Sequence, residues 1–358
     1  MKLICEKKAL LPALAKVKHC LAKGSLPVLE TVLLEAEESL KLTATNLTLT
    51  ALINCEAEVK ESGKLCVDGL KFLGIVRRFP GEEIRFSQKG ETLIVDCGKA
   101  HFELATIPAT EFPEVELAIL GEKQANIGEL ITLMSKVSFC ADDSSEERFN
   151  VVFLGDDIIA TDGRRLAKVE KLEESSVKAS LPVDFVKLLP IMFGKDAGNG
   201  GINLKDGRVI FSDGKMTFAS QLVERQSPDW KRIFPNKFNC SFRVDKKAFV
   251  DSVERVALLG NESLAVRLDI TDEYKAILTA NSDGGMAREE LSIRDLEGNV
   301  IIAFSARLLR GLEKIDAEEL LVKFTDSNSA IVVEPVNPGH LEQGFTFIMM
   351  PIKIEKED

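Results

Sequence analysis

Acidic pairs are the residues of this chain whose types and spacing come closest to catalytic chemistry. Asp142-Asp143 and Asp156-Asp157 could each hold Mg²⁺, as carboxylates do in metal-dependent nucleases. Each pair lies among polar residues that are typical of loops, and neither has a third acidic residue at a fixed offset. Asp162 is also conceivable as a metal ligand, but a turn at that position explains it fully. Solvated loops are therefore the simpler interpretation, and a magnesium-dependent nuclease is the alternative.

Other catalytic and metal-binding motifs are missing from the sequence. It has no Walker-type phosphate loop, no His-Glu-x-x-His and no Gly-x-Ser-x-Gly. His19, His101 and His340 are too far apart in sequence to give a zinc-ligand spacing. The seven cysteines form no Cys-x-x-Cys pair and have mostly apolar neighbours, which predicts buried free thiols in a reducing cytoplasm. We expect no catalytic residue, no metal and no cofactor.

The composition predicts a soluble protein of more than one domain. A chain of 358 residues is too long for one ordinary core, so two or three domains are expected. Hydrophobic content of 45% and charged content of 29% are typical of globular proteins. No apolar run is long enough to span a membrane and the first residues do not resemble a signal peptide, so we expect a cytoplasmic protein. A net charge of −11 by itself argues against binding to nucleic acid.

The most informative motif lies near the middle of the chain, where residues 160–167 read Ala-Thr-Asp-Gly-Arg-Arg-Leu-Ala. Apolar runs that are typical of strands flank this motif on both sides. Asp-Gly between such runs indicates a hairpin, because both turn residues tolerate a positive φ. A surface hairpin is the simplest interpretation. Two adjacent arginines directly after the turn are more than a turn requires.

The sequence pattern repeats three times along the chain. Each copy has a first helix, an alternating pair of strands, a second helix and closing strands. The first helices are expected at residues 7–21, 127–139 and 246–259, and the strand pairs at 40–52, 158–169 and 276–291. The second helices are expected at residues 69–79, 184–193 and 306–315, and the closing strands at 92–107, 209–223 and 330–354. The pattern predicts three α+β domains, residues 1–118, 119–237 and 238–358, with helices on one face of antiparallel sheets.

Positive charge is concentrated in the six predicted helices, although the chain as a whole is acidic. The main contributors are Lys7, Lys8, Lys16, Lys18, Arg77, Arg78, Lys187, Arg307, Arg310 and Lys314. For any single helix, an ordinary solvated face is the simpler interpretation. If the six helices share one surface, that surface is basic inside an acidic body.

Three stretches together resemble the bacterial beta sliding clamp family, in the same order along the chain. The first is the motif at residues 160–167. The second is Leu-Val-Glu at 222–224 with Pro-Asp-Trp-Lys-Arg-Ile-Phe-Pro at 228–235, and the third is Phe-Ile-Met-Met-Pro-Ile at 347–352. The resemblance extends over nearly the whole chain. It implies three clamp domains with helices lining the inside and antiparallel sheets outside, joined head to tail in a ring-shaped homodimer.

The resemblance also implies a function and a set of partners. Such a clamp is not an enzyme: it encircles double-stranded DNA without reading its sequence and tethers the replicative DNA polymerase. The clamp loader, other polymerases and repair factors dock through short clamp-binding peptides in a hydrophobic cleft, in which apolar anchors fill a groove and arginines fix polar ends. The cleft residues implied here are Thr161, Gly163, Arg165, Leu166, Pro228, Arg232, Ile233, Ile348, Met350, Pro351 and Ile352.

The C-terminal stretch allows more than one interpretation. Residues 345–354 are also typical of a core strand, and Pro351 favours an edge strand because proline cannot donate to a central ladder. The chain departs from the family at Lys353, where arginine is frequent, and at Ala330, where serine often lines the groove. It also continues past the usual end with an acidic tail, Glu355–Asp358. These departures concern the preference for particular peptides.

The resemblance implies DNA-binding and dimer residues as well. The DNA-binding set combines basic residues of the helices with two loop residues: Lys23, Arg77, Arg78, Arg148, Lys187, Arg307 and Arg310. At the dimer interface, apolar residues of the first and third domains would meet, flanked by opposite charges, with His101 beside the two lysines. That interface set is Lys71, Lys99, Phe102, Leu104, Leu258, Leu259, Glu289 and Glu290. A peptide-binding repeat scaffold that does not encircle DNA is the alternative function.

Overall fold

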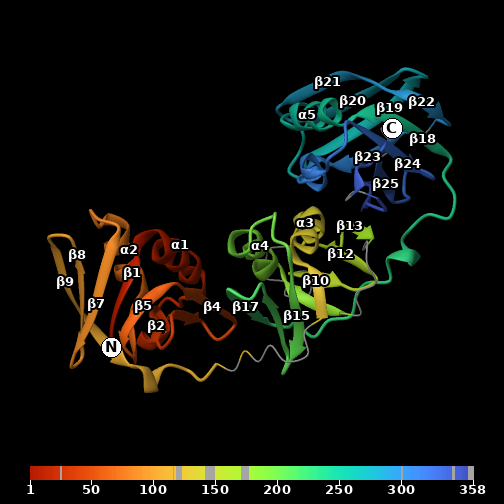
Figure 1. The fold of residues 1–358 in the computed structure, drawn as a ribbon. Coiled ribbons are helices and arrows are strands. Elements are labelled where there is room, and N and C mark those ends of the chain that lie inside the picture. The colour runs from red at the N-terminus through yellow and green to blue at the C-terminus, as the bar shows by residue number, and fades with distance from the viewer. Residues whose placement is uncertain are drawn as a thin grey trace. The chain divides into compact units, whose positions relative to one another are not determined.

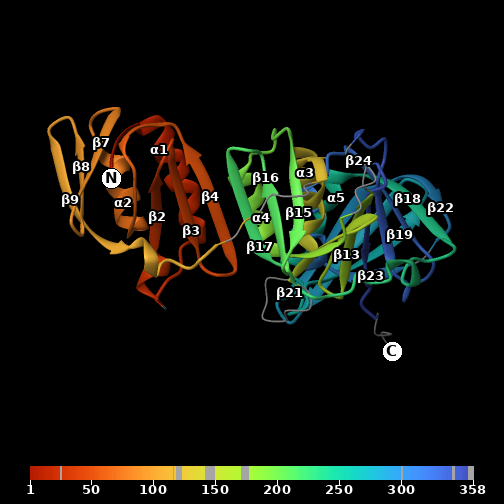
Figure 2. The same ribbon diagram turned by 60° about the horizontal axis from the view of Figure 1, so that its bottom comes forward.

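The computed structural model describes residues 1–24, 26–115, 117, 123–141, 150–170, 177–299, 301–340 and 343–353. The chain divides into two compact units (Figures 1 and 2). Unit 1 comprises residues 1–128 and 188–222, and unit 2 comprises residues 129–187 and 223–358. Each unit is described by itself below.

The first repeat lies entirely in unit 1 and has the predicted order of elements. Its first helix begins where Leu10, Leu14 and Val17 start to recur at helical spacing, and these three side chains are buried. Its second helix is capped by Asp68, whose carboxylate accepts the backbone N–H of Lys71. The elements are β1 (Lys2–Glu6), α1 (Lys7–Val17), η1 (Lys18–Cys20), η2 (Pro27–Glu30), β2 (Thr31–Ala36), β3 (Leu40–Thr45), β4 (Leu49–Cys55), β5 (Ala57–Glu61), β6 (Gly63–Asp68), α2 (Gly69–Arg78), β7 (Glu83–Lys89), β8 (Thr92–Cys97), β9 (Ala100–Pro108) and η3 (Ala109–Glu111).

The second repeat also follows the predicted order and is divided between the two units. The division falls within its two α-helices, after Gly128 and after Lys187. Its elements are β10 (Lys123–Asn126), α3 (Ile127–Val137), η4 (Ser138–Cys140), β11 (Val151–Leu154), β12 (Asp157–Thr161), β13 (Arg165–Glu170), β14 (Ala179–Pro182), α4 (Val183–Met192), β15 (Asn199–Lys205), β16 (Arg208–Ser212), β17 (Met216–Gln221) and η5 (Trp230–Arg232).

The third repeat lies in unit 2 and contains one correction to the sequence prediction. The helix expected at residues 306–315 is two short 3-10 helices, separated at Gly311, where φ is +99°. A Cβ at this glycine would lie 2.3 Å from the Phe139 ring, so this close approach requires glycine and interrupts the helix. The elements are β18 (Cys240–Asp245), α5 (Lys246–Ala257), β19 (Ala265–Asp272), β20 (Lys275–Ser282), β21 (Gly285–Ser292), β22 (Arg294–Glu297), β23 (Ile302–Ser305), η6 (Ala306–Leu309), η7 (Leu312–Lys314), β24 (Glu319–Phe324), β25 (Ile331–Pro335) and β26 (Thr346–Met349).

All strand pairs of the described residues are antiparallel, and each sheet belongs to one unit. Unit 1 contains the order β10-β15-β16-β17-β4-β3-β2-β6-β9-β8-β7-β1-β5. Unit 2 contains β14-β11-β12-β13-β26-β25-β24-β18-β22 and the separate sheet β21-β20-β19-β23. Two ladders therefore join successive repeats: β17 with β4, and β13 with β26. Helices α1 and α5 pack on sheet faces, α1 against β3 and β4 and α5 against β20 and β21 (Figure 1).

The prediction that the C-terminal stretch is an edge strand was wrong. Strand β26 lies in the middle of its sheet, with β13 on one side and β25 on the other. Pro351 does not disturb either ladder, because β26 ends at Met349 and the proline lies beyond the last paired residue.

Candidate functional site

The hairpin turn between β12 and β13 is fixed by its own side chains. One carboxylate oxygen of Asp162 accepts the backbone N–H groups of Arg164 and Arg165, both at 2.9 Å. The Thr161 hydroxyl donates to the backbone carbonyl of Arg165 and accepts the N–H of Gly163, whose φ is +83°. These hydrogen bonds stabilise the turn and explain the Thr-Asp-Gly part of the motif.

Arg165 has a different role from the one its motif position implied. Its side chain is only 14% exposed, and its guanidinium donates to Asp162 at 2.9 Å and to the carbonyl oxygen of Phe139 at 2.8 Å. It also donates to the carbonyl oxygens of Leu308 and Arg310, at 3.2 and 2.7 Å. The guanidinium thus ties the hairpin to the ends of two other segments of unit 2, and its donors are engaged by the protein itself.

An apolar cluster occupies one face of the sheet around the ladder between β13 and β26. The register places Leu166 opposite Ile348, and Ile348 opposite Val332. Because successive strand residues alternate between faces, these residues share the face opposite Phe347, which packs against Phe139 after helix α3. The cluster consists of Val151, Phe153, Ile159, Leu166, Ala330, Val332 and Ile348.

The segment that connects the second and third repeats covers this cluster. We call residues 223–238 the strap. Val223, Trp230, Phe234 and Phe238 of the strap are partly buried against the cluster. The Trp230 and Phe234 rings meet edge to face at 5.9 Å, and the Phe234 and Phe238 rings at 5.8 Å. Pro228, Arg232 and Ile233 of the strap were among the predicted site residues, but Val223, Trp230, Phe234, Phe238 and the buried Lys168 beneath Trp230 were not. The apolar spacing within residues 228–235 was the available signal for the aromatic ones.

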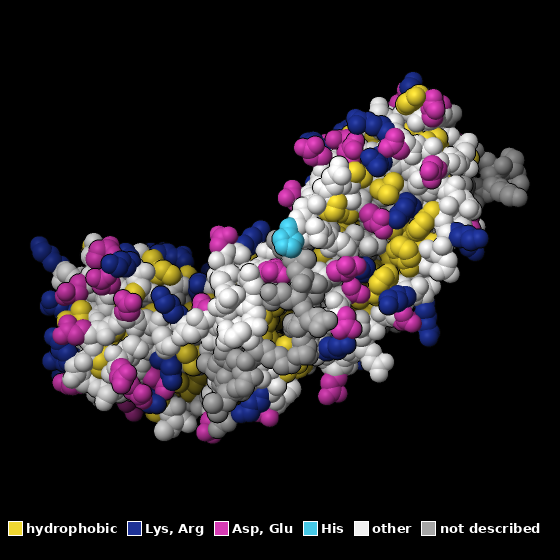
Figure 3. Space-filling model, turned by 45° about the vertical axis from the view of Figure 1, so that its right-hand side comes forward, with side chains coloured by type: hydrophobic (Ala, Val, Ile, Leu, Met, Phe, Trp, Pro, Cys, Tyr) yellow, Lys and Arg dark blue, Asp and Glu magenta, His cyan; other side chains and the backbone are white. Residues whose placement is uncertain are grey.

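The predicted cleft residues have unequal exposure in unit 2. Leu166 and Ile348 are 2% and 1% exposed and belong to the apolar cluster. Ile233 and Met350 are 45% and 43% exposed and provide apolar surface. Of the other predicted members, Thr161, Arg165, Pro228, Pro351 and Ile352 are half-buried, Gly163 is exposed, and Arg232 is exposed and paired with Asp229. On the face drawn in Figure 3, hydrophobic side chains reach the surface among charges of both signs.

The predicted dimer residues of unit 1 line an apolar groove between α2 and β9. Its cavity volume is about 440 Å³, and its walls include Lys71, Phe79, Phe102 and Leu104. Phe79 and Phe102 meet edge to face at 5.5 Å, and Phe102 is 38% exposed. Residues 100–105 pair with β8 on one side, and only residues 106–108 of β9 pair with β6. Lys99 is exposed beside this groove.

The predicted dimer residues of unit 2 lie around the outer edge of the four-stranded sheet, at strand β21. Leu258 and Leu259 follow helix α5 and are 81% and 37% exposed. Strand β21 pairs with β20 and is the outermost strand of its sheet. The two predicted acidic residues, Glu289 and Glu290, have partners within the chain. Glu289 accepts from Arg255 at 2.6 Å and from Ser252 at 2.7 Å, and Glu290 lies 3.5 Å from Lys275.

The predicted DNA-binding residues are exposed wherever the structure describes them. Lys23, Arg77 and Arg78 are exposed in unit 1, and Lys187, Arg307 and Arg310 are exposed in unit 2. Arg148 lies outside the described residues, as do the acidic pair at 142–143 and the tail at 355–358.

The acidic residues that raised the possibility of a nuclease have protein partners. Asp156 pairs with Lys178, Asp157 with Lys168 and Trp230, and Asp162 with its own turn. Within the described part of the chain, no group of three or more His, Cys, Asp or Glu side chains is arranged to hold a metal ion. All seven cysteines are free and buried, as predicted, and burial raises the pKa of the Cys5 thiol to about 11. None of the described helices is long and apolar enough to cross a membrane.

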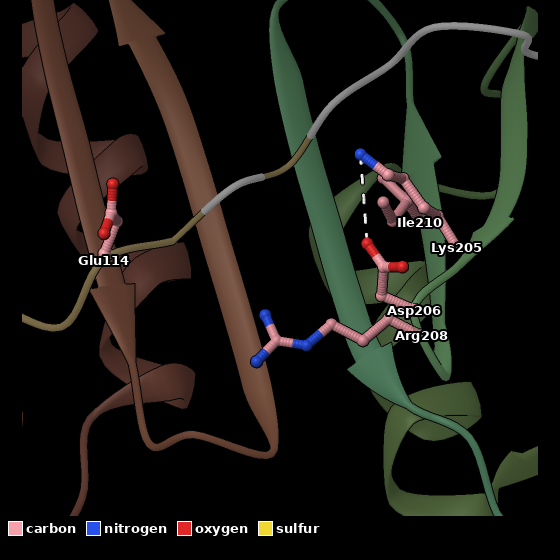
Figure 4. A pocket seen from close by; sticks show the side chains of 5 residues that line it. All are labelled: Glu114, Lys205, Asp206, Arg208 and Ile210. Carbon is pink, nitrogen blue, oxygen red and sulfur yellow. Dashed lines mark ion pairs between the residues drawn. The ribbon is translucent and has the colours of Figure 1, made fainter.

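A separate polar pocket lies at the hairpin between β15 and β16 in unit 1 (Figure 4). It is lined by Glu114, Lys205, Asp206, Arg208 and Ile210, and Lys205 and Asp206 form an ion pair at 3.9 Å. Acidic and basic groups balance within it, which gives it no preference for an anion or a cation.

Comparisons with known proteins agree with the fold. The family model for the DNA polymerase III beta subunit, N-terminal domain, matches residues 1–116, and the model for its C-terminal domain matches residues 231–353. The beta sliding clamps of Caulobacter vibrioides and Escherichia coli are 28% and 27% identical, over 99% of this chain and 100% of each relative. The sliding clamp of Pseudomonas aeruginosa bound to griselimycin superposes with a TM-score of 0.90 at 26% identity, covering 99% of this chain and 100% of that one. The beta subunit of Thermotoga maritima gives 0.87 at 26% identity, with the same coverage of both chains.

Repeated α+β units joined by antiparallel ladders, matched over the full length, define a DNA sliding clamp: a processivity subunit that performs no catalysis itself. The chain belongs to the bacterial beta sliding clamp family, the beta subunit of DNA polymerase III. The resemblance drawn from the sequence is confirmed.

Proposed function

We infer that this protein encircles duplex DNA as a ring-shaped homodimer and tethers the replicative DNA polymerase to its template. The observation that carries this inference is the structural match to sliding clamps over 99% of the chain. A match of that extent includes all three repeats and both ladders, whereas a peptide-binding scaffold would need only the strap and the sheet beneath it. We propose three clamp domains, residues 1–118, 119–237 and 238–358, and a place in the cytoplasm, which the seven free thiols favour.

The dimer contact joins the first domain of one copy to the third domain of another. Leu258 and Leu259 of one copy fill the groove that Phe102 and Leu104 line in the other. Residues 100–105 of β9 pair with β8 on one side only, and their other side pairs with the outer edge of β21 in the second copy. This pairing removes two unpaired strand edges at once. Lys71 and Lys99 lie on one side of this contact and Glu290 on the other. Since Glu289 is held by Arg255 of its own chain, its contribution is to fix that helix rather than to attract the partner.

Contacts with DNA are electrostatic and do not read its sequence. Lys23, Arg77, Arg78, Arg148, Lys187, Arg307 and Arg310 are the residues we assign to phosphate contacts. A chain with a net charge of −11 has weak affinity for DNA in free solution, and such contacts fade as salt rises. Retention therefore depends on closure of the ring around the duplex.

The polymerase, the clamp loader and repair factors bind the cleft beside the strap. Ile233 and Met350 supply the exposed apolar surface and Leu166 and Ile348 the floor. Thr161, Gly163, Pro228, Arg232, Pro351 and Ile352 complete its rim. Met350 is a flexible side chain that adapts to different partner sequences. Arg165 supports this site from below through its bonds to backbone carbonyls.

The oligomeric state tests this function. Changing Leu258 and Leu259 together to Lys places charge in an apolar contact, so we expect the dimer to dissociate to monomers of 39.4 kDa. The measurement is light scattering coupled to gel filtration. The matched control is Tyr274→Lys, an exposed aromatic residue (64%) of the same unit, which should remain dimeric. A wild-type protein that is monomeric, or a double variant that is still dimeric, would place the interface elsewhere.

A further inference from the structure

A charged cluster around the buried Lys168 lies under one end of the strap. The indole N–H of Trp230 donates to Asp157 at 3.0 Å. The ammonium group of Lys168 lies 4.7 Å from the centre of the Trp230 ring, 3.4 Å from Asp157 and 3.2 Å from Glu170. The side chain of Lys168 is only 6% exposed. The ring is therefore held both at its N–H edge and on its face.

Neither the hairpin nor the apolar cluster requires this arrangement. Lys168 lies on the same sheet face as Leu166, two residues further along β13, where a valine or isoleucine would extend the apolar cluster. A lysine there gives up its hydration and needs partners, and the structure supplies two carboxylates and an indole ring. A buried cation with this set of partners specifies one position for the ring above it.

The strap depends on side chains for its position. Ser180 accepts the N–H of Val223 with its carbonyl and donates its hydroxyl to the carbonyl of Arg225. Lys237 accepts from the Thr325 hydroxyl further along the strap. Between these points, the backbone hydrogen bonds of the described residues are within the strap itself. After Val223, Trp230 is the next side chain of the strap that packs against the sheet.

The position of Trp230 determines the position of Ile233, the exposed apolar residue that we assign to one wall of the cleft. The backbone N–H groups of Ile233 and Phe234 both donate to the carbonyl oxygen of Trp230, at 3.1 and 3.2 Å. A displacement of Trp230 would therefore carry Ile233 with it and move the exposed apolar surface that Ile233 supplies. The far end of the strap has a similar contact, with Lys323 at 4.8 Å from the Phe238 ring. That contact lies on β24, three strands from β13, or about 14 Å.

We propose that Trp230, held by Asp157 and Lys168, is a positioning residue for the binding of partner peptides and sets the width of the cleft that receives their apolar side chains. The proposal rests on the proposed function of the cleft. It adds that peptide affinity depends on the hydrogen bond between Trp230 and Asp157, although neither residue needs to touch the peptide.

The test is a double-mutant cycle with a fluorescein-labelled clamp-binding peptide from the replicative polymerase of the same organism. Trp230→Phe keeps a ring but removes the N–H, and Asp157→Leu removes its acceptor. We expect each variant to bind about tenfold more weakly, and the double variant no more weakly than either one. Asp157→Asn keeps an acceptor for the indole N–H and should bind within about threefold of wild type. Fluorescence anisotropy measures the affinities of wild type and the four variants, and Trp230→Phe carries the test if Asp157→Leu fails to fold.

Two further measurements separate positioning from general loss of stability. Lys323→Met removes the same kind of cation–ring contact at the far end of the strap and should leave peptide affinity unchanged. Trp230 is the only tryptophan of the chain, so its emission should shift when unlabelled peptide binds to the wild type and to Lys323→Met. It should also be red-shifted in free Asp157→Leu, because the ring is no longer held against the sheet.

The outcomes distinguish this inference from the proposed function. If Met350→Ala weakens binding while Trp230→Phe and Asp157→Leu bind as wild type does, the cleft is correct and the positioning role is overturned. If Lys323→Met weakens binding as much as Asp157→Leu, the strap acts only as a general cover and the inference fails. If none of the variants changes binding, the peptide binds elsewhere and the proposed cleft fails with it.

Discussion

The two ladders that join successive repeats have the same backbone and different outer faces. In the ladder between β17 and β4, Thr217 lies opposite Leu52, and buried hydroxyls gather around it: Thr217 donates to Ser212 at 3.3 Å. Across the pair of strands β3 and β4, Thr45 and Thr50 bond at 2.8 Å. These hydroxyls satisfy one another and interrupt the apolar side chains of this face, such as Leu52 and Ile210. In the ladder between β13 and β26, the same face carries aliphatic residues under the strap.

The segments beside the two ladders differ in the same way. The polar pocket of Figure 4 brings Glu114, which follows β9, to Arg208 on the face that carries the hydroxyls. The strap brings three aromatic rings to the second ladder. The repeated fold therefore forms a ladder between successive repeats in both places. The side chains on the outer face of that ladder determine whether it binds a partner.

The largest effect is expected at Arg165, which has no counterpart among the residues described at the first ladder. Arg165→Met leaves the carbonyls of Phe139, Leu308 and Arg310 without their donor, so the free energy of unfolding should fall by about 3 kcal/mol. Chemical denaturation followed by circular dichroism measures it. Arg232→Met is the matched control, since Arg232 also pairs with an aspartate three residues earlier at 2.9 Å but is 85% exposed. Equal losses in both variants would contradict the assignment of Arg165 as a structural tie.

A smaller effect, on binding rather than stability, is expected at the exposed apolar rim of the second ladder. Met350→Ala removes an anchor contact for the partner peptide and should raise its Kd by about thirtyfold, or about 2 kcal/mol. The measurement is titration calorimetry with the polymerase peptide. Leu204→Ala is the control near the first ladder, where an exposed apolar residue (37%) lies on β15. Peptide binding that is as sensitive to Leu204→Ala would mean that the two junctions do not differ in function.

The smallest effect is expected outside both ladders, at His101. Hydrogen bonds to the carboxylates of Asp96 and then Glu103, which accept from the protonated ring, raise the pKa of this exposed imidazole above its ordinary value. A raised folded-state pKa stabilises the protein fully below the ordinary pKa of histidine, about 6.5, and this stabilisation is lost as pH rises through the folded-state pKa. The melting temperature of wild type should therefore exceed that of His101→Gln most at low pH and converge with it at high pH. A constant difference across the pH range would exclude titration of His101 as its cause.

Local patterns predicted the elements well because their causes are local. The apolar spacing of residues 7–17 and the Asp-Gly turn at 162–163 are read directly from neighbouring residues. The helix expected at 306–315 failed because the close approach of Phe139 to Gly311 joins residues far apart in sequence. For the same reason, the role of Arg165 was not visible: its acceptors lie 26, 143 and 145 residues away along the chain.

The candidate site was predicted through the family resemblance rather than through physical pattern. Its floor residues, Leu166 and Ile348, are indistinguishable from core residues in the sequence, and in the structure they are buried. The cluster of Asp157, Lys168 and Trp230 forms only when the strap crosses the sheet, so no spacing in the sequence indicates it. Residues that act through tertiary contacts of this kind require the fold to be known.

Retention on DNA tests the central claim most directly. The protein is loaded by its clamp loader onto closed circular DNA and onto the same DNA cut once, and both are passed through gel filtration at a salt concentration that abolishes equilibrium binding. A ring that encircles the duplex stays on the closed circle and leaves the linear form by sliding off its ends. Equal retention on both forms, or loss from both, would contradict encirclement.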